Sequence, residues 1–80
     1  MDEKKKGLLR TGEVLERSGI SRQSFYQYLS IGLVWPETTT ESGRHYFSPD
    51  VLRRLEIIER LKKMGYTLRD IKDIFFKDEQ

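Results

Sequence analysis

A three-residue break, Gly19-Ile20-Ser21, places the tightest constraint on how this 80-residue chain can fold. Apolar residues recur at helical spacing over residues 11–18 and again over residues 22–31, on either side of the break. Gly19 is expected to end the first helix, while Ser21 caps the second through its side-chain oxygen. Thr11 is predicted to cap the first helix in the same way. Two helices joined by so short a turn are typical of a helix-turn-helix.

The second of these helices has a buried side and a polar side. Phe25, Tyr28 and Leu29 fall three and four residues apart, so they are predicted to face the core. The outward side then consists of Arg22, Gln23, Tyr26, Gln27 and Ser30. It contains no carboxylate, although 13 of the 80 residues are Asp or Glu. Such a face suits the DNA major groove, where Arg binds guanine and Gln binds adenine; an ordinary solvated helix face is the alternative.

Two short apolar stretches, LVWPE and HYF, follow this helix and are separated by the polar segment TTTESGR. The pattern predicts a two-stranded hairpin, with Pro36 at an edge or at the end of the first strand. Arg44, His45 and Tyr46 would lie at or beside its tip, within reach of a phosphate backbone. An ordinary charged turn is the alternative. Alternation along the strand predicts that Phe47 points into the core.

The remaining residues carry two further helical patterns. Ser48-Pro49-Asp50 is a helix start, and this helix is predicted to run to about Met64. A last helix is predicted to begin at Thr67, with Asp70 completing a capping box. Two buried faces are predicted for the longer helix: Val51, Leu52, Leu55 and Ile58 on one, and Ile57, Leu61 and Met64 on the other, against the last helix. The last helix is predicted to bury Leu68, Ile71, Ile74 and Phe75.

Composition limits the class of protein. With 36% hydrophobic residues, 80 residues form one small domain. The absence of cysteine excludes disulfides and thiolate metal sites, and it fits a reducing cytoplasm. No apolar run reaches the roughly 18 residues needed to span a bilayer, and the N-terminal segment lacks the apolar stretch of a signal peptide. We therefore expect a soluble, cytoplasmic chain without membrane contact.

Charge and catalytic residues give weaker indications. The net charge of +2 is a weak sign of an anionic partner, and residues 10–47 hold four Arg against four Glu. His45 is the only histidine, and no nucleophile, phosphate-binding glycine loop or metal-ligand pair accompanies it. We expect no enzyme, no catalytic or metal-binding residue and no cofactor. Trp35 and Tyr28 are interpreted as packing residues rather than base-stacking residues.

The stretch from about Leu9 to Phe75 resembles the N-terminal DNA-binding domain of MerR-type transcription regulators. TGEVLERSGISRQSFYQYLSIGLVWP follows the family's Gly-Glu-Val-Ala start, Gly-Val-Ser turn, aromatic recognition helix, Ile-Gly-Leu and proline. ESGRHYFSPDVLRRLEIIERLKKMGYTLRDIKDIF follows its Ser-Gly-Tyr-Arg-x-Tyr wing and its third and fourth helices. The resemblance implies a mostly α winged helix-turn-helix in the order helix, helix, hairpin wing, helix, helix. We expect this domain over residues 8–77, between a disordered tail (1–7) and a C-terminal end (78–80).

The resemblance also implies a function: sequence-specific binding of double-stranded DNA by a bacterial regulator, with the second helix in the major groove and the wing on phosphates. Many members activate by twisting and bending an over-long promoter spacer, so RNA polymerase is a candidate further partner. The expected DNA-binding residues are Thr11, Arg17, Ser21, Arg22, Gln23, Tyr26, Gln27, Arg44, His45 and Tyr46.

Two departures from the family pattern change the expected contacts. The usual Arg-Tyr-Tyr of the recognition helix is here Tyr26-Gln27-Tyr28, which removes a cation. The Tyr-Arg pair of the wing is here Arg44-His45, which moves the cation by one residue. Regulators of this family continue into a long dimerisation helix, so a homodimer is expected only if a longer parent supplies it. Two alternatives stay open: an architectural factor of the excisionase or terminase-small-subunit type, and a protein-interaction module of the chaperone-modulator type.

Overall fold

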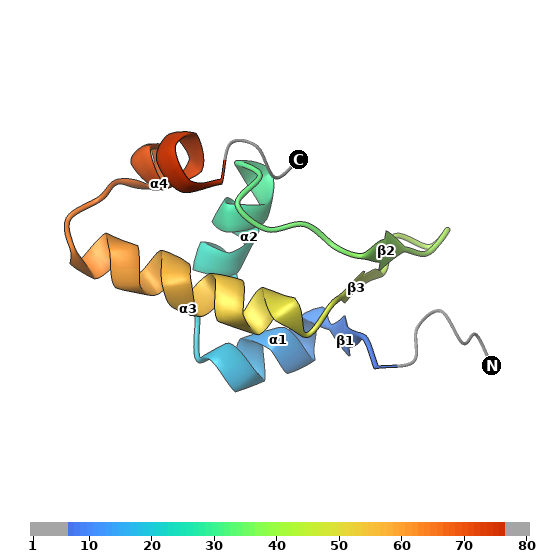
Figure 1. Ribbon diagram of the computed structural model, residues 1–80. Coiled ribbons are helices and arrows are strands. Elements are labelled where there is room, and N and C mark those ends of the chain that lie inside the picture. The colour runs from blue at the N-terminus through green and yellow to red at the C-terminus, as the bar shows by residue number, and fades with distance from the viewer. Residues whose placement is uncertain (1–6, 77–80) are drawn as a thin grey trace.

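The computed structural model describes residues 7–76 of the chain. Within them, four helices and a small antiparallel sheet form a winged helix-turn-helix, which confirms the predicted fold class (Figure 1). The elements are β1 (Leu9–Arg10), α1 (Thr11–Ser18), α2 (Arg22–Ser30), β2 (Thr38–Thr39), β3 (His45–Phe47), α3 (Asp50–Lys63) and α4 (Leu68–Phe75). The predicted C-terminal end and all but the last residue of the predicted tail lie outside the described residues.

The turn between α1 and α2 forms as predicted. Gly19 adopts a left-handed conformation, with φ of 75°, and its N–H donates to the Leu15 carbonyl at 2.9 Å. Ser21 then caps α2, because its Oγ accepts a hydrogen bond from the Ser24 N–H at 3.1 Å. The Ser18 hydroxyl oxygen accepts from the Ile20 N–H at 3.2 Å, which holds the turn between them. These short-range bonds fix the start of α2 relative to α1.

The predicted cap at the start of α1 is wrong. Thr11 is the first residue of the helix and does not cap it. Instead, the Glu13 carboxylate accepts a hydrogen bond from the Arg10 N–H at 2.9 Å, which satisfies a donor at the helix N-terminus. Arg10 is also the last residue of β1, so the strand leads directly into the helix, which begins at Thr11.

The wing is a three-stranded sheet in the order β1-β3-β2 rather than the predicted two-stranded hairpin. The first strand of the hairpin is Thr38–Thr39, and the prediction of a strand in the LVWPE segment is wrong. Leu33 and Val34 are fully buried, and the Leu33 N–H donates to the Tyr28 carbonyl at 2.9 Å. Because α2 and the core hold these two residues, pairing with β3 begins only at Glu37, whose N–H donates to Tyr46.

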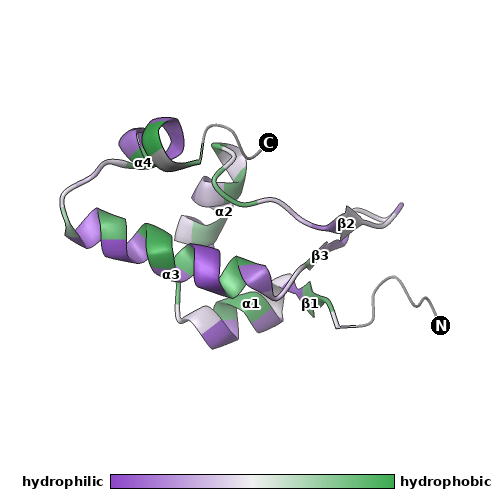
Figure 2. Cartoon of the chain, in the orientation of Figure 1, coloured by the Kyte–Doolittle hydropathy of each residue, from purple (hydrophilic) through white to green (hydrophobic). Residues whose placement is uncertain are grey.

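The core lies among the four helices and the sheet, and Figure 2 shows hydrophobic residues of α3 alternating with hydrophilic ones around the helix. Phe47 is fully buried, as predicted, and its ring meets that of Phe25 edge-on with centroids 5.2 Å apart. The largest fully buried side chains are Tyr28, Phe25, Phe47, Leu33, Leu55, Ile58, Ile71, Val14 and Val34. None of the helices within residues 7–76 is long and apolar enough to cross a membrane.

The second buried face predicted for α3 is largely absent. Ile57 and Met64 are 38% and 66% exposed, and Ile74 of α4 is 62% exposed, so these three predictions are wrong. Ile71 is buried as predicted, and Phe76 is buried beyond the end of the helix; the side chain of Phe75 lies outside the described part.

The placement of α4 explains this exposure. The Lys72 Nζ donates to the Gly32 carbonyl at 3.2 Å, which ties α4 to the turn after α2 (Figure 1). Arg54 of α3 holds the same region, because its Nε donates to the Leu33 carbonyl at 2.7 Å. Its guanidinium lies 4.5 Å from the Trp35 ring centroid and 4.1 Å from that of Phe76. Trp35 therefore packs against the protein, as predicted.

The start of α4 follows the sequence signal, whereas the N-cap of α3 is Pro49, one residue after Ser48, which the sequence predicted as the cap. The Ser48 Oγ accepts a hydrogen bond from the Asp50 N–H at 3.2 Å, with Pro49 between them at φ of −55°. At α4, the Thr67 Oγ1 accepts from the Asp70 N–H at 3.0 Å, and the Asp70 carboxylate accepts from the Thr67 N–H at 3.1 Å. The predicted capping box is confirmed.

Candidate nucleic-acid interface

The solvent-facing strip of α2 is the central feature of the candidate interface. Phe25 and Tyr28 are fully buried, so the opposite side of the nine-residue helix is turned outward. The exposed residues of this strip are Arg22, Gln23, Tyr26, Gln27 and Ser30, as predicted. The helix contains no Asp or Glu. The strip therefore offers hydrogen-bond donors and acceptors and one cation, with nothing that repels a phosphate.

Arg22 and Tyr26 lie one helical turn apart on this strip. The Arg22 Nη1 donates to the Tyr26 hydroxyl at 3.4 Å, and the guanidinium lies 6.0 Å from the ring centroid. Both values are at the long end for such interactions, and Tyr26 is 45% exposed. The Arg22 side chain is thus oriented along the helix surface, but its contacts with Tyr26 are weak. A ligand with two adjacent acceptors can therefore replace Tyr26 as the partner of the guanidinium.

A first hollow, of about 380 Å³, lies between α2 and the wing. We call it the wing-side hollow; it is lined by Arg10, Thr11, Gly12, Tyr26, Ser42, Gly43, Arg44 and His45. The structure thus brings together four of the predicted site residues, from the start of α1, the middle of α2 and the wing. No carboxylate is among the described residues that line it, whereas it has two Arg side chains.

Sequence reasoning missed Arg10. It belongs to this hollow because β1 pairs with β3, which places Arg10 opposite Tyr46 in the sheet. The apolar pair Leu8-Leu9, just before the first helix, is a sequence signal for a short extended stretch, but it does not identify the partner strand. A cation at residue 10 becomes a neighbour of the wing only through this long-range pairing.

The wing residues point to different sides of the sheet. His45 shares a side with Phe47, since their rings lie 6.1 Å apart, and its Nδ1 lies 3.0 Å from the Thr39 Oγ1. Tyr46, between them, is half-buried and lines neither of the hollows beside α2. The structure therefore places Arg44 and His45 with α2, and it separates Tyr46 from them.

A second hollow, of about 990 Å³, lies between the α1–α2 turn and α3. We call it the α3-side hollow. It contains Arg17 and Ser21, so these two predicted residues lie apart from the wing residues. The Ser21 Oγ is already used to cap α2. Arg22, Gln23 and Gln27 line neither hollow, and Gln23 and Gln27 form the ridge between the two.

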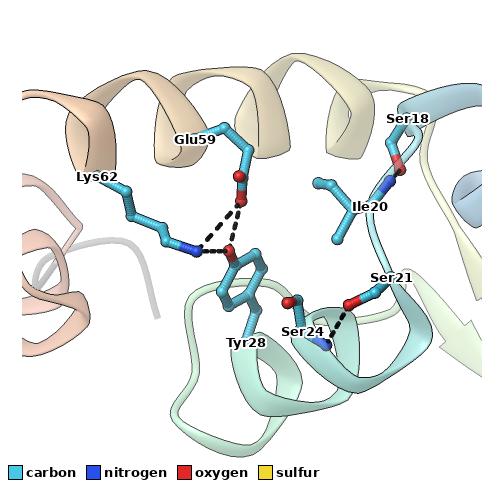
Figure 3. A network of polar contacts seen from close by, with 7 residues as sticks. All are labelled: Ser18, Ile20, Ser21, Ser24, Tyr28, Glu59 and Lys62. Atoms are coloured by element: carbon cyan, nitrogen blue, oxygen red, sulfur yellow. Dashed lines mark hydrogen bonds and ion pairs between the residues drawn. The ribbon is translucent and has the colours of Figure 1, made fainter.

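A polar cluster behind α2 fixes the helix to α3 (Figure 3). The Tyr28 hydroxyl donates to the Glu59 Oε2, and the Lys62 Nζ donates to the Tyr28 oxygen at 2.9 Å. The Lys62 Nζ and the Glu59 Oε2 lie 3.8 Å apart. Sequence reasoning missed this cluster, because nothing in the local pattern pairs residue 28 with residues 59 and 62.

The cluster keeps both of its proton donors protonated. Burial, followed by the hydrogen bond to Glu59, raises the pKa of Tyr28 above its ordinary value of 10.0. The hydrogen bond to Tyr28 is the largest cause of the raised pKa of Lys62. At neutral pH the Tyr28 hydroxyl therefore donates and the Lys62 ammonium is charged, so the cluster holds α2 in one orientation.

The fold and the acid-free strip on α2 define a winged helix-turn-helix protein. More specifically, the chain belongs to the MerR family, since the family model described as "MerR HTH family regulatory protein" matches residues 9–77. This match confirms the resemblance found in the sequence.

Relatives in this family are named as regulators. The chain is 31% identical over 62 residues to the mercuric resistance operon regulatory protein of Bacillus cereus, covering 78% of this chain and 47% of that protein. It is 32% identical over 72 residues to the multidrug-efflux transporter 2 regulator of Bacillus subtilis, covering 90% and 26%. It is 29% identical over 66 residues to the HTH-type transcriptional regulator HmrR of Rhizobium leguminosarum bv. viciae, covering 82% and 50%. The chain spans half or less of the length of these relatives.

Proposed function

We propose that this chain binds double-stranded DNA in a sequence-specific manner, as the DNA-binding domain of a MerR-type transcription regulator. The domain comprises residues 8–77. The observation that carries the proposal is the exposed, carboxylate-free strip of α2, bordered by a hollow with cations from β1 and the wing. Membership of a family of regulatory proteins supports the same conclusion.

In this proposal α2 lies in the major groove. The groove is wide enough for one α-helix, and recognition helices contact base edges with residues near their N-termini. Arg22 and Gln23 are the first two residues of α2, and both are exposed. Arg22 can bind the O6 and N7 of a guanine, and Gln23 can bind the N6 and N7 of an adenine. Tyr26 and Gln27 lie one turn further along and contact the following base pairs.

The wing-side hollow receives the sugar-phosphate backbone. Arg10 and Arg44 supply charge, and the Thr11 and His45 side chains supply hydrogen-bonding groups around the same space. Contacts of this kind fix the position of a protein on the duplex but do not distinguish base sequences. The two sets of residues therefore have separate roles, base reading on α2 and positioning at the wing.

We extend the proposal to the whole regulator. This regulator acts on transcription in the cytoplasm, and RNA polymerase is a candidate further partner. It forms a homodimer where a longer parent chain supplies a dimerisation helix. The names of the three relatives, which refer to regulators, support the role in transcription.

Selection from a randomised duplex library, followed by gel shifts at increasing salt, tests the proposal. We expect a defined sequence to be recovered and its affinity to fall steeply with salt, as counterion release requires. Recovery of no sequence, or binding that does not change with salt, would contradict it. An architectural factor would also bind duplex, and the size of the bend that it induces in circularly permuted fragments carrying the selected site would separate it from a plain regulator. A protein-interaction module would capture a protein partner after nuclease treatment, and it would bind no duplex.

A further inference from the structure

His45 lines the wing-side hollow with only one of its ring nitrogens engaged. The Nδ1 lies 3.0 Å from the Thr39 Oγ1, and the ring packs edge-on against that of Phe47. Thr39 and His45 face each other in the β2–β3 pair, so the sheet itself sets this contact. Within residues 7–76, the Nε2 of the ring makes no hydrogen bond. The ring is therefore held in place while one nitrogen is left for a ligand.

The partner of the Nδ1 suits both charge states of the ring. A hydroxyl group can donate one hydrogen bond and can also accept. When the ring is neutral with its proton on Nε2, the Thr39 hydroxyl donates to the Nδ1. When the ring is protonated, both nitrogens carry hydrogen and the same hydroxyl accepts from the Nδ1. His45 can therefore gain a proton without a rearrangement of the wing.

The wing-side hollow holds no anion that could offset the charge of a protonated ring. Besides His45, the titratable or charged groups among its described lining residues are Arg10 from β1, Tyr26 from α2 and Arg44 from the wing. Two of these are cations, and the third is a phenol, a group without charge at neutral pH. The carboxylates of the neighbouring segments do not line the hollow; they are Glu13, Glu37 and Glu41. The counter-charge must therefore come from the ligand.

We propose that binding of DNA at the wing is coupled to protonation of His45, so that the affinity depends on pH. This inference rests on the proposed function and adds a regulation by pH. A neutral ring donates an ordinary hydrogen bond from its Nε2 to a backbone phosphate, whereas a protonated ring makes a shorter and stronger, charge-assisted one. His45 is the only histidine, and the chain has no cysteine. It is thus the one side chain of an ordinary type that changes charge between about pH 5 and pH 8.

The direction of the pH effect follows from linkage. Because a phosphate binds the charged ring more tightly than the neutral one, DNA binding must favour uptake of the proton to the same extent. A histidine ring is mostly charged near pH 5.5 and mostly neutral near pH 8, so the affinity should decrease between these values. One charge-assisted hydrogen bond corresponds to a change in affinity of about tenfold.

The test measures the affinity for the duplex that the wild-type chain selects, at about pH 5.5 and pH 8 and at several salt concentrations. We expect binding to be about tenfold weaker at the higher pH. The slope of log Kobs against log salt should also be shallower there by about 0.9, because one phosphate contact has lost its charge. The single histidine gives one set of ring signals in NMR spectra. Their titration midpoint should move to higher pH when the duplex is added.

Three variants separate His45 from the rest of the hollow. His45→Gln keeps a polar side chain that cannot titrate, so it should bind about as the wild type does at pH 8 and show no pH dependence. His45→Arg has a permanent charge and should bind equally well at both pH values. Arg44→Ala is the matched control, because it removes a cation from the same hollow. It should weaken binding at every pH and keep the pH dependence. Circular dichroism at both pH values checks that each variant is folded.

The outcomes distinguish this inference from the proposed function. If the wild-type chain binds its selected duplex equally well at both pH values, the inference is wrong and the proposed function stands. If His45→Gln keeps the pH dependence of the wild type, another group takes up the proton and the assignment to His45 is refuted. If the wild-type chain selects no duplex, the proposed function fails and this inference fails with it.

Discussion

The hydroxyl of Tyr28, on the buried side of α2, donates a hydrogen bond to the carboxylate of Glu59 on α3. The Tyr28 ring is fully buried, so the bond joins the back of the candidate reading helix to the longest helix of the domain. Lys62 completes the cluster from the next turn of α3 (Figure 3). The orientation of the exposed strip of α2 therefore depends on a polar contact as well as on the apolar core.

Replacing Tyr28 by Phe should lower the free energy of unfolding. The ring still fills its site, but Glu59 and Lys62 lose their shared partner, at a cost of about 1 kcal/mol. Urea unfolding measures the difference. Tyr26→Phe is the matched control, because the same hydroxyl is removed from an exposed ring whose hydrogen bond to Arg22 is long. An equal loss in both variants would show that the buried cluster contributes nothing special.

Stability should fall at alkaline pH. The pKa values of Tyr28 and Lys62 are both raised in the folded chain above their ordinary values of 10.0 and 10.5. Their contribution is thus fully present below about pH 10, and it is lost as the pH rises further. The urea midpoint measured from pH 7 to pH 11 should decline at the alkaline end. The decline should be smaller in Tyr28→Phe; an identical decline would contradict the assignment to this cluster.

Arg22→Ala should relax the preference for one base pair of the selected site. A bidentate contact between Arg and guanine discriminates against other bases by about 1 to 3 kcal/mol. Affinities for a set of duplexes, each with a single base pair changed, measure this preference. The variant should lose discrimination at one position and keep it elsewhere. A uniform loss at all positions would place Arg22 on the backbone instead.

Arg44→Ala should show the opposite behaviour. Because Arg44 lies in the wing-side hollow, it is expected to bind phosphate and to support all sequences alike. The variant should weaken binding uniformly, and the salt slope should become shallower by about 1. A change in base preference without a change in slope would contradict the role of the wing.

Local signals in the sequence predicted most of the helix boundaries. Gly19 and Ser21 mark the turn, and Thr67 with Asp70 forms the predicted capping box, because these contacts join residues at most four positions apart. The exposed strip of α2 was also predictable, since helical periodicity alone separates it from Phe25 and Tyr28.

Long-range packing decided what the sequence could not predict. Leu33 and Val34 belong to an apolar stretch that predicts a strand, but both side chains are buried in the core. The first strand of the hairpin therefore begins only at Thr38. Met64 and Ile74 follow helical spacing, yet α4 is tied to the turn after α2 and leaves them exposed. In the same way, Arg10 reaches the wing only through β1–β3 pairing, and the cations of α3 meet Arg17 only in the folded chain.

Single-atom changes in the major groove test the central claim most directly. Each guanine of the selected duplex is replaced in turn by 7-deazaguanine, which removes the N7 acceptor from the major groove and leaves the minor groove unchanged. We predict one guanine at which this change weakens binding of the wild-type chain but not of Arg22→Ala. If no major-groove substitution affected binding, or if Arg22→Ala responded as the wild type does, α2 would not read DNA as proposed.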